Sequence, residues 1–103
     1  MKKIGMTWKV KPEHMDEYVD IHLNPWSDLI EGLQSVGVHN YNIFRFGDQM
    51  FAYLEVESDD SLAEFQKLPV ADRWNAKVLP WVAAEAKEGG DQFMMLDRVF
   101  YCE

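Results

Sequence analysis

Residues 13–37 of the chain read EHMDEYVDIHLNPWSDLIEGLQSVG, and this stretch decides the fold. Its apolar side chains recur every three or four residues, which is the spacing of one buried helical face. The members of this face are Met15, Tyr18, Val19, His22, Trp26, Leu29, Leu33 and Val36. Acidic residues fill the opposite face, and Gly37 stands where a left-handed C-cap is usual. The pattern predicts an amphipathic helix over residues 13–37.

His22 is out of character on this face, because an aliphatic residue is expected there. Tyr18 and Trp26 lie four residues away on either side, so the three side chains are predicted to form one strip. Pro25 removes a backbone donor and is expected to interrupt the helix just after His22. A histidine can move protons near neutral pH, but a lone histidine on such a face is more often a hydrogen-bonded core residue.

Alternating apolar residues predict strands on both sides of this helix. Residues 4–10 alternate with a period of two, and Lys11-Pro12 ends that strand. Residues 38–46 and 50–57 are rich in β-formers and flank a hairpin turn at Gly47-Asp48-Gln49. In the strand over 50–57, both faces are apolar: Phe51 and Tyr53 lie on one face, and Ala52, Leu54 and Val56 lie on the other.

The second half of the chain predicts two helices and a closing strand. Ser58 is the expected N-cap of a short helix that Pro69 ends. A second helix is expected over residues 70–87, bent at Pro80 and stopped by Gly89-Gly90. The residues of that helix expected to point inward are Trp74, Val78, Trp81 and Val82. Residues 93–101 are expected to form the last strand.

The element order is strand, helix, strand, strand, helix, strand. Right-handed crossovers then give an α+β fold of the ferredoxin-like βαββαβ type, a four-stranded antiparallel sheet with helices on one face. Because several strands are apolar on both faces, the uncovered face needs a partner. A second copy of the chain is the simplest one, so we expect a homodimer through the sheet face.

Composition narrows the function further. At 103 residues, with 48% hydrophobic and 14% aromatic residues, the chain (1–103) is expected to be one compact domain. A net charge of −8 disfavours nucleic acid and anionic membranes as partners. With neither a signal peptide nor a membrane-spanning stretch in view, a cytoplasmic protein is expected. Cys102 cannot form an intrachain disulfide, and the histidines lack zinc-site spacing, so we expect no metal.

Two further groups of residues combine aromatic rings with hydrogen-bonding groups. They are His39-Asn40-Tyr41 and Asp72-Arg73-Trp74-Asn75. Each group alone could be core packing or strand pairing. Together with the strip around His22 they suit a neutral ligand rich in hydroxyl groups, because a sugar offers C–H faces to rings and hydroxyls to polar tips.

Motifs along nearly the whole chain resemble those of the L-rhamnose mutarotase family. They are Val10-Lys11-Pro12, Glu17-Tyr18, His22, Asn24-Pro25-Trp26, Leu29, Gly37-Val38-His39-Asn40-Tyr41, Arg73-Trp74 and Val99-Phe100-Tyr101. The resemblance implies a dimeric α+β barrel that works without a cofactor. It implies an isomerase that interconverts the α and β anomers of a 6-deoxy sugar. L-rhamnose is the first choice, with L-fucose or a related sugar next.

The resemblance also assigns the site. It places the general acid/base on His22, the sugar-contacting tyrosines on Tyr18 and Tyr41, and a pocket tryptophan on Trp74. Trp26 from the strip and Asn75 complete the expected substrate-binding set. Two positions depart from the family pattern: Leu23 separates His22 from Asn24-Pro25, and Asn75 stands where a second tryptophan is common. The departure at Asn75 bears more on the identity of the sugar than on the class of activity.

Two other functions stay open at this point. One is a cofactor-free monooxygenase of the dimeric α+β barrel type, which would hold a flat phenolic substrate. The other is a non-catalytic small-molecule binding module in which His22 is a satisfied core residue. The polar residues Asn40, Asn42 and Asn75 favour a more polar ligand than a phenol.

Overall fold

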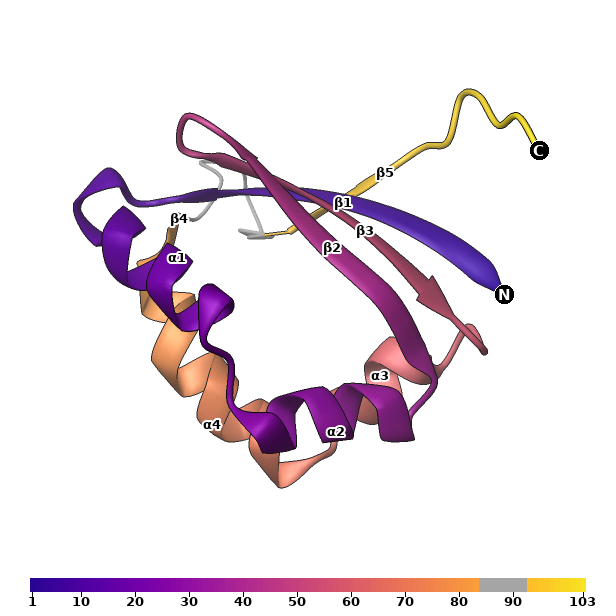
Figure 1. Ribbon diagram of the computed structural model, residues 1–103, viewed down its shortest axis with the longest axis horizontal. Coiled ribbons are helices and arrows are strands. Elements are labelled where there is room, and N and C mark those ends of the chain that lie inside the picture. The colour runs from indigo at the N-terminus through magenta and orange to yellow at the C-terminus, as the bar shows by residue number, and fades with distance from the viewer. Residues whose placement is uncertain (84–92) are drawn as a thin grey trace, which may run out of the picture.

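The computed structural model describes residues 1–83 and 93–103, and in them an antiparallel sheet packs against a layer of helices (Figure 1). Strands β1 (Lys2–Val10), β2 (Val38–Phe46) and β3 (Gln49–Val56) lie in the order β2-β3-β1. The short strands β4 (Val82–Ala83) and β5 (Met94–Leu96) both pair with β1. This confirms the predicted ferredoxin-like order, with two short strands in the place of one closing strand.

All four described helices lie on the same side of the sheet (Figure 1). They are α1 (Met15–Leu23), α2 (Ser27–Ser35), α3 (Ser61–Gln66) and α4 (Pro69–Val78), with 3-10 turns η1 (Pro12–His14) and η2 (Leu79–Trp81). The main core lies between the layers: Trp8 and Val10 of β1 meet Met15 and Tyr18 of α1 there. The other face of the sheet carries no described helix.

The predicted interruption at Pro25 is confirmed. The helical face of residues 13–37 is divided between α1 and α2, and Pro25 lies in the short linker between them. Gly37 has a φ of +84° two residues after α2 ends, the position and conformation of a glycine C-cap. Met15, Tyr18 and Leu29 are buried, and the remaining predicted members of the face are half-buried.

The alternation predicted for β3 is also confirmed. Ala52, Leu54 and Val56 are buried under the helices, whereas Phe51 and Tyr53 are exposed on the opposite face, at 39% and 37% of their surface. Both faces of this strand are therefore apolar, but the helices cover only one of them.

Ser58 is not the N-cap that the sequence predicts. The helix begins later, at Ser61, and its N-cap is Asp60. The Ser58 hydroxyl accepts the N–H of Asp60 at 3.1 Å, and Ser61 Oγ accepts the N–H of Ser58 at 3.2 Å. The two serines thus close a hydrogen-bonded turn that leads into the helix, a local alternative that serine side chains offer to capping.

The helix predicted over 70–87 is wrong at both ends. Pro69 opens α4 instead of preceding it, because its missing N–H is harmless at the first helical position. The helix ends at Val78, Pro80 lies in η2, and Val82 is buried on β4. The rest of the predicted helix, with Gly89-Gly90, lies outside the described residues.

The closing strand predicted over 93–101 is shorter than expected. Only Met94–Leu96 pairs with β1, opposite Thr7 to Gly5. The charged pair Asp97-Arg98 ends the apolar run, and residues 97–103 have no regular structure. Val99 and Phe100 are 94% and 79% exposed.

Candidate active site

The structure brings four of the predicted site residues into one chain of ring contacts between the layers. Tyr18 and His22, one turn apart on α1, have ring centroids 4.3 Å apart. The ring centroids of His22 and Trp74, on α4, are 5.2 Å apart in an edge-to-face contact, and those of Trp26 and Trp74 are also 5.2 Å apart. The helix break at Pro25 changes the predicted strip, since the ring that Trp26 contacts is that of Trp74. Edge-to-face contacts of this kind stabilise the arrangement of the rings.

The hydrogen bonding of His22 fixes which nitrogen is free. His22 Nδ1 lies 2.7 Å from the backbone carbonyl oxygen of Tyr18. A carbonyl oxygen can only accept, so Nδ1 must carry the proton and donate it. In the neutral ring Nε2 is then the unprotonated nitrogen, and no described residue hydrogen-bonds to it. The arrangement leaves a basic lone pair on a fixed ring.

Burial keeps this ring neutral. Loss of solvent around His22 lowers its pKa below the ordinary value of 6.5, and the bond to the Tyr18 carbonyl opposes this effect only in part. The imidazole is therefore uncharged at pH 7 and ready to accept a proton at Nε2. His22 is half-buried, so the ring is not sealed inside the core.

Tyr18 is held as a donor by Trp8 of β1, which lies in the strand predicted over residues 4–10 and is not among the predicted site residues. Trp8 Nε1–H donates to the Tyr18 hydroxyl at 2.7 Å, and both side chains are buried. Burial raises the pKa of Tyr18 far above its usual value, although the bond from Trp8 opposes the shift. Because its oxygen accepts from Trp8, the hydroxyl proton of Tyr18 can point elsewhere. A buried tryptophan needs a hydrogen-bond acceptor for its N–H, and this need is the sequence feature that could have linked Trp8 to the site.

Tyr41 approaches the same cluster from β2. The residue as a whole is 37% exposed, yet burial of its hydroxyl raises the pKa of Tyr41 to about 12. Tyr41 also contributes to raising the pKa of Tyr18, so the two hydroxyls lie within electrostatic range of each other. Both remain protonated at neutral pH and can offer hydrogen bonds to a ligand.

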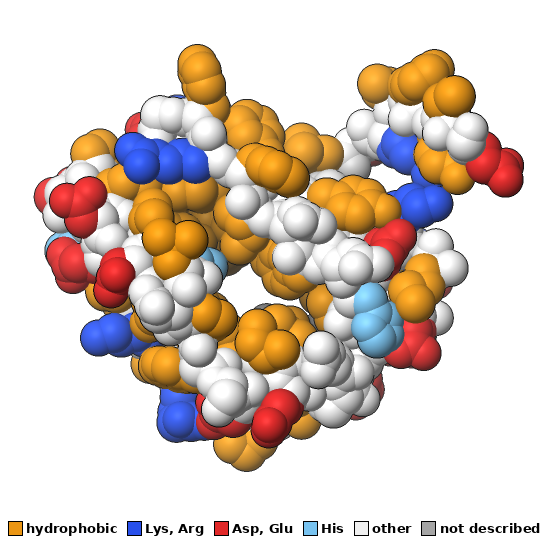
Figure 2. Space-filling view, viewed as in Figure 1, with side chains coloured by type: hydrophobic (Ala, Val, Ile, Leu, Met, Phe, Trp, Pro, Cys, Tyr) orange, Lys and Arg blue, Asp and Glu red, His pale blue; other side chains and the backbone are white. Residues whose placement is uncertain are grey.

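A cavity of about 260 Å³ lies between α2 and β2, and Tyr41 is the only predicted site residue that lines it. Figure 2 shows the surface hollowed between the sheet and the helices, with hydrophobic side chains around the hollow. The volume is just below the roughly 300–1,000 Å³ typical of pockets for drug-sized ligands, so it suits a small ligand. Another cavity of about 280 Å³ is lined by Glu17, Asp20, Ile21, Asn24, Lys77 and Trp81. It contains none of the predicted site residues.

Arg73 and Asn75, the two neighbours of Trp74 on α4, have different partners. The guanidinium of Arg73 pairs with Asp28 and lies 5.4 Å from the centroid of the Trp26 ring, which ties Trp26 to α4. Asn75 donates its amide N–H to Gln66 Oε1 at 2.8 Å. A sugar contact by Asn75 stays a prediction, and its amide oxygen and second amide N–H are the groups available for it.

The described part of the chain limits other kinds of site. In residues 1–83 and 93–103, no three His, Cys, Asp or Glu side chains are grouped so that they could hold a metal ion. No helix in these residues is long and apolar enough to cross a bilayer.

Comparison with known proteins identifies the family. A family model described as L-rhamnose mutarotase matches residues 3–102. The L-rhamnose mutarotase of Shouchella clausii is 38% identical over 74 residues, covering 70% of this chain and 71% of that protein. Among solved structures, the L-rhamnose mutarotase from Formosa agariphila has a TM-score of 0.80 at 22% identity, with both chains fully covered. Tetracenomycin F2 cyclase from Streptomyces glaucescens has a TM-score of 0.71 at 16% identity, again with full coverage of both.

The fold and the ring cluster define a ferredoxin-like α+β protein with a histidine and aromatic site between its two layers. Within that class, the chain belongs to the L-rhamnose mutarotase family, which consists of isomerases that act on a carbohydrate. The resemblance that the sequence motifs suggested is thereby confirmed. The roles of the individual site residues remain predictions.

Proposed function

We propose that this protein interconverts the α and β anomers of L-rhamnose by general acid/base ring opening and closure at His22. The observation that carries the mechanism is the fixed, neutral imidazole, whose Nδ1 is hydrogen-bonded to the Tyr18 carbonyl and whose ring packs against Trp74. The family match supports the class of sugar. A cytoplasmic location, expected from the sequence, accompanies this proposal.

The reaction moves two protons. His22 Nε2 takes the proton of the anomeric hydroxyl as the bond between the anomeric carbon and the ring oxygen breaks, and the ring oxygen receives a proton. The aldehyde then rotates about its bond to the next carbon, and the ring closes on the other face with both protons returned. The high pKa of Tyr18 favours a hydrogen-bond donor over a proton donor. Water or the newly formed imidazolium therefore donates the proton that the ring oxygen receives.

The rings around His22 suit one face of a deoxy sugar. Trp26 and Trp74 meet at an interplanar angle of 88° and offer two apolar walls at right angles. The C–H face and the methyl group of a 6-deoxy sugar can lie against such walls, while the hydroxyls of Tyr18 and Tyr41 donate to sugar oxygens. L-fucose or a related sugar would undergo the same chemistry. Such a sugar stays a candidate because Asn75 stands where a tryptophan is common in the family, and this change alters the contacts that select the sugar.

Anomer exchange measured by saturation-transfer NMR tests this function. With L-rhamnose, irradiation of one anomeric proton should transfer saturation to the other anomer faster when the protein is present, and L-fucose serves as the comparison sugar. Binding without faster exchange would contradict the proposal and favour a binding module. Absence of any sugar effect, with oxidation of a hydroquinone instead, would favour the monooxygenase.

We also propose that the chain forms a homodimer through the uncovered face of the sheet. On that face Phe44 of β2 lies opposite Phe51 of β3, and the two are 64% and 39% exposed. Tyr53 continues the same face at 37% exposure and pairs with Gly5 of β1. An apolar face of this kind stays in water only at a cost, and an identical face covers it by two-fold symmetry.

Phe44→Glu is expected to convert the dimer to a monomer, because it would bury two carboxylates at a symmetric interface. Size-exclusion chromatography with light scattering gives the mass directly. Leu23→Glu is the matched control, since Leu23 is 75% exposed at the end of α1, in the helix layer. A monomeric wild-type protein, or a Phe44→Glu variant that remains dimeric, would contradict the proposed interface.

A further inference from the structure

Strand β2 contains a bulge just before Tyr41. Its pairing with β3 runs regularly through Val38–Val56 and His39–Glu55 and resumes at Asn42–Tyr53. Two residues of β2, Asn40 and Tyr41, therefore stand opposite one residue of β3. An extra residue of this kind shifts the alternation of side chains along a strand.

The shift determines which way Tyr41 points. Val38 and Ile43 pair with Val56 and Ala52, which are buried under the helices, so both ends of the segment face inward. In an uninterrupted strand, residues five apart face opposite sides. The bulge restores the inward direction for Ile43 and with it for Tyr41, two residues earlier. Without the bulge, Tyr41 would point to the exposed face of the sheet.

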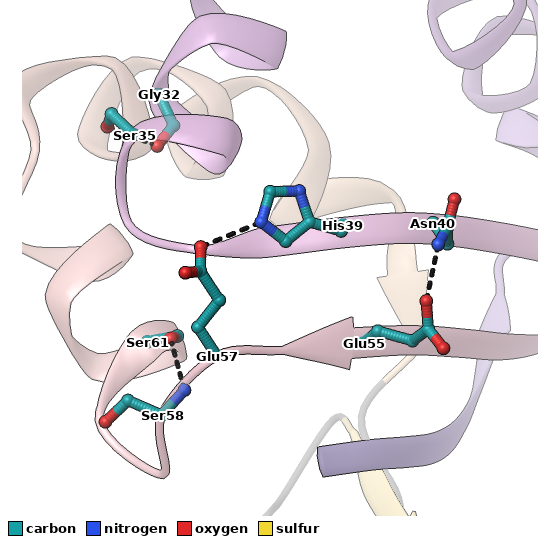
Figure 3. Close-up of polar contacts among 8 residues, drawn as sticks. All are labelled: Gly32, Ser35, His39, Asn40, Glu55, Glu57, Ser58 and Ser61. Atoms are coloured by element: carbon teal, nitrogen blue, oxygen red, sulfur yellow. Dashed lines mark hydrogen bonds and ion pairs between the residues drawn. The ribbon is translucent and has the colours of Figure 1, made fainter. Parts of the chain in front are cut away.

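The bulge is stabilised by a network around Asn40, shown in part in Figure 3. Asn40 has a φ of +49°, the only positive value outside glycine in the described residues. Its side-chain N–H donates to Glu55 Oε1, and the hydroxyl of Tyr53 donates to Glu55 Oε2 at 3.0 Å. Asn42 donates to the backbone oxygen of Asn40 at 2.8 Å.

The charge state of Glu55 is consistent with this network. The hydrogen bonds from Asn40 and Tyr53 lower the pKa of Glu55, so the carboxylate stays ionised and accepts from both donors. Asparagine is one of the few residues that tolerate the left-handed conformation. The position therefore needs both the backbone freedom and the side-chain donor of Asn40.

We propose that Asn40 and Glu55 are positioning residues, whose hydrogen bond holds the β2 bulge and thereby turns the Tyr41 hydroxyl into the site. Neither residue is assigned a contact with the sugar. The effect on sugar affinity rests on the proposed mutarotase function. The effect on the direction of Tyr41 does not, and it can be measured in the free protein.

Asn40→Asp is the sharpest single change. It keeps the size and the tolerance for positive φ, but it removes the donor and sets a second carboxylate against Glu55. The double variant Asn40→Asp/Glu55→Gln restores a hydrogen bond with donor and acceptor exchanged, since the glutamine amide can donate to the aspartate and still accept from Tyr53. Net charge is the same in the wild type and the double variant.

Two readouts follow each variant. In protein labelled with ¹³C at the tyrosine ring carbon that bears the hydroxyl, the Tyr41 signal of the wild type should not titrate up to about pH 11. In Asn40→Asp it should titrate near the ordinary value of about 10. KM for L-rhamnose should rise about tenfold with kcat changed less than about threefold, as expected for lost binding. The double variant should return both quantities toward wild type.

Each outcome decides the inference. A Tyr41 signal unchanged in Asn40→Asp would overturn it, and so would a shifted signal with unchanged KM in an active enzyme. If Asn40→Asp does not fold, Asn40→Gly keeps the positive φ and removes only the side-chain bond, and it should shift the Tyr41 titration in the same direction. If the wild type does not accelerate anomer exchange, the proposed function fails, while the Tyr41 titration still decides whether the bulge positions this ring.

Discussion

His22→Gln should slow anomer exchange by about a hundredfold to ten-thousandfold, the range that general acid/base groups contribute. Glutamine can still donate to the Tyr18 carbonyl, so the helix and its hydrogen bond can persist. It offers no basic lone pair for the anomeric proton. Saturation-transfer NMR with L-rhamnose measures the loss, and the melting temperature of the variant reports whether the fold is kept.

His14→Gln is the matched control for this change. His14 is also half-buried and precedes α1, but its imidazole pairs with Glu17 at 3.3 Å and stacks on Trp81 instead of on the rings around His22. Its variant should exchange anomers within about twofold of the wild-type rate, as expected of a group without a role in proton transfer. A His22→Gln variant as active as His14→Gln would remove His22 from the mechanism.

The pH dependence of the activity should also reflect the protonation of His22. Catalysis requires neutral His22, so activity should fall as pH drops through the pKa of this ring in the folded protein, which lies below 6.5. The stability of the fold should also fall as the pH drops. The unfolded chain takes up the proton at a higher pH than the folded one does, so acidification from 6.5 through the folded pKa lowers the free energy of unfolding. An acid limb of kcat/KM above pH 6.5 would contradict the assignment.

Local sequence patterns were enough for the elements that set the fold. The period of three to four residues in 13–37 and the period of two in β1 each mark a face turned toward the core, and the structure buries or half-buries the predicted residues of both faces. The extent of α4 was not predictable in the same way. Val78 and Val82 fit one helical face, but Val82 belongs to a strand because β1 offers Val10 as its pairing partner. Long-range pairing there outweighs the helical pattern.

The candidate site shows the same division. The contact between Tyr18 and His22 follows from their spacing of four residues on α1, and it was predictable. The contact between Trp26 and Trp74 was not, because it joins the start of α2 to α4 across 48 positions of sequence. Likewise, the bulge at Asn40 has no signature in a strand that otherwise reads as regular. It becomes visible only from the register between β2 and β3.

Trp74→Ala should be the most damaging change outside His22, because Trp74 packs against both the cluster around Tyr18 and the cluster around Leu29. Truncating a buried tryptophan costs about 3–5 kcal/mol, and for this half-buried ring we expect about 2–3 kcal/mol. The variant also loses the wall beside His22 and one side of the right-angled pair with Trp26. Sugar affinity should fall by about twofold to tenfold, the range that a lost aromatic contact of about 0.5–1.5 kcal/mol gives.

Chemical denaturation and sugar titration separate the two effects, and Trp81→Ala is the control for them. Trp81 is a half-buried tryptophan that packs against the same Tyr18 cluster, but it lies in η2 and lines the cavity that lacks the predicted site residues. Both alanine variants should lose stability, and Trp74→Ala alone should lose sugar affinity. Trp74→Phe keeps a ring and should recover most of both. Equal loss of affinity in Trp81→Ala would mean that the sugar site extends to the outer side of α1 and α4, and that Trp74 acts only through packing.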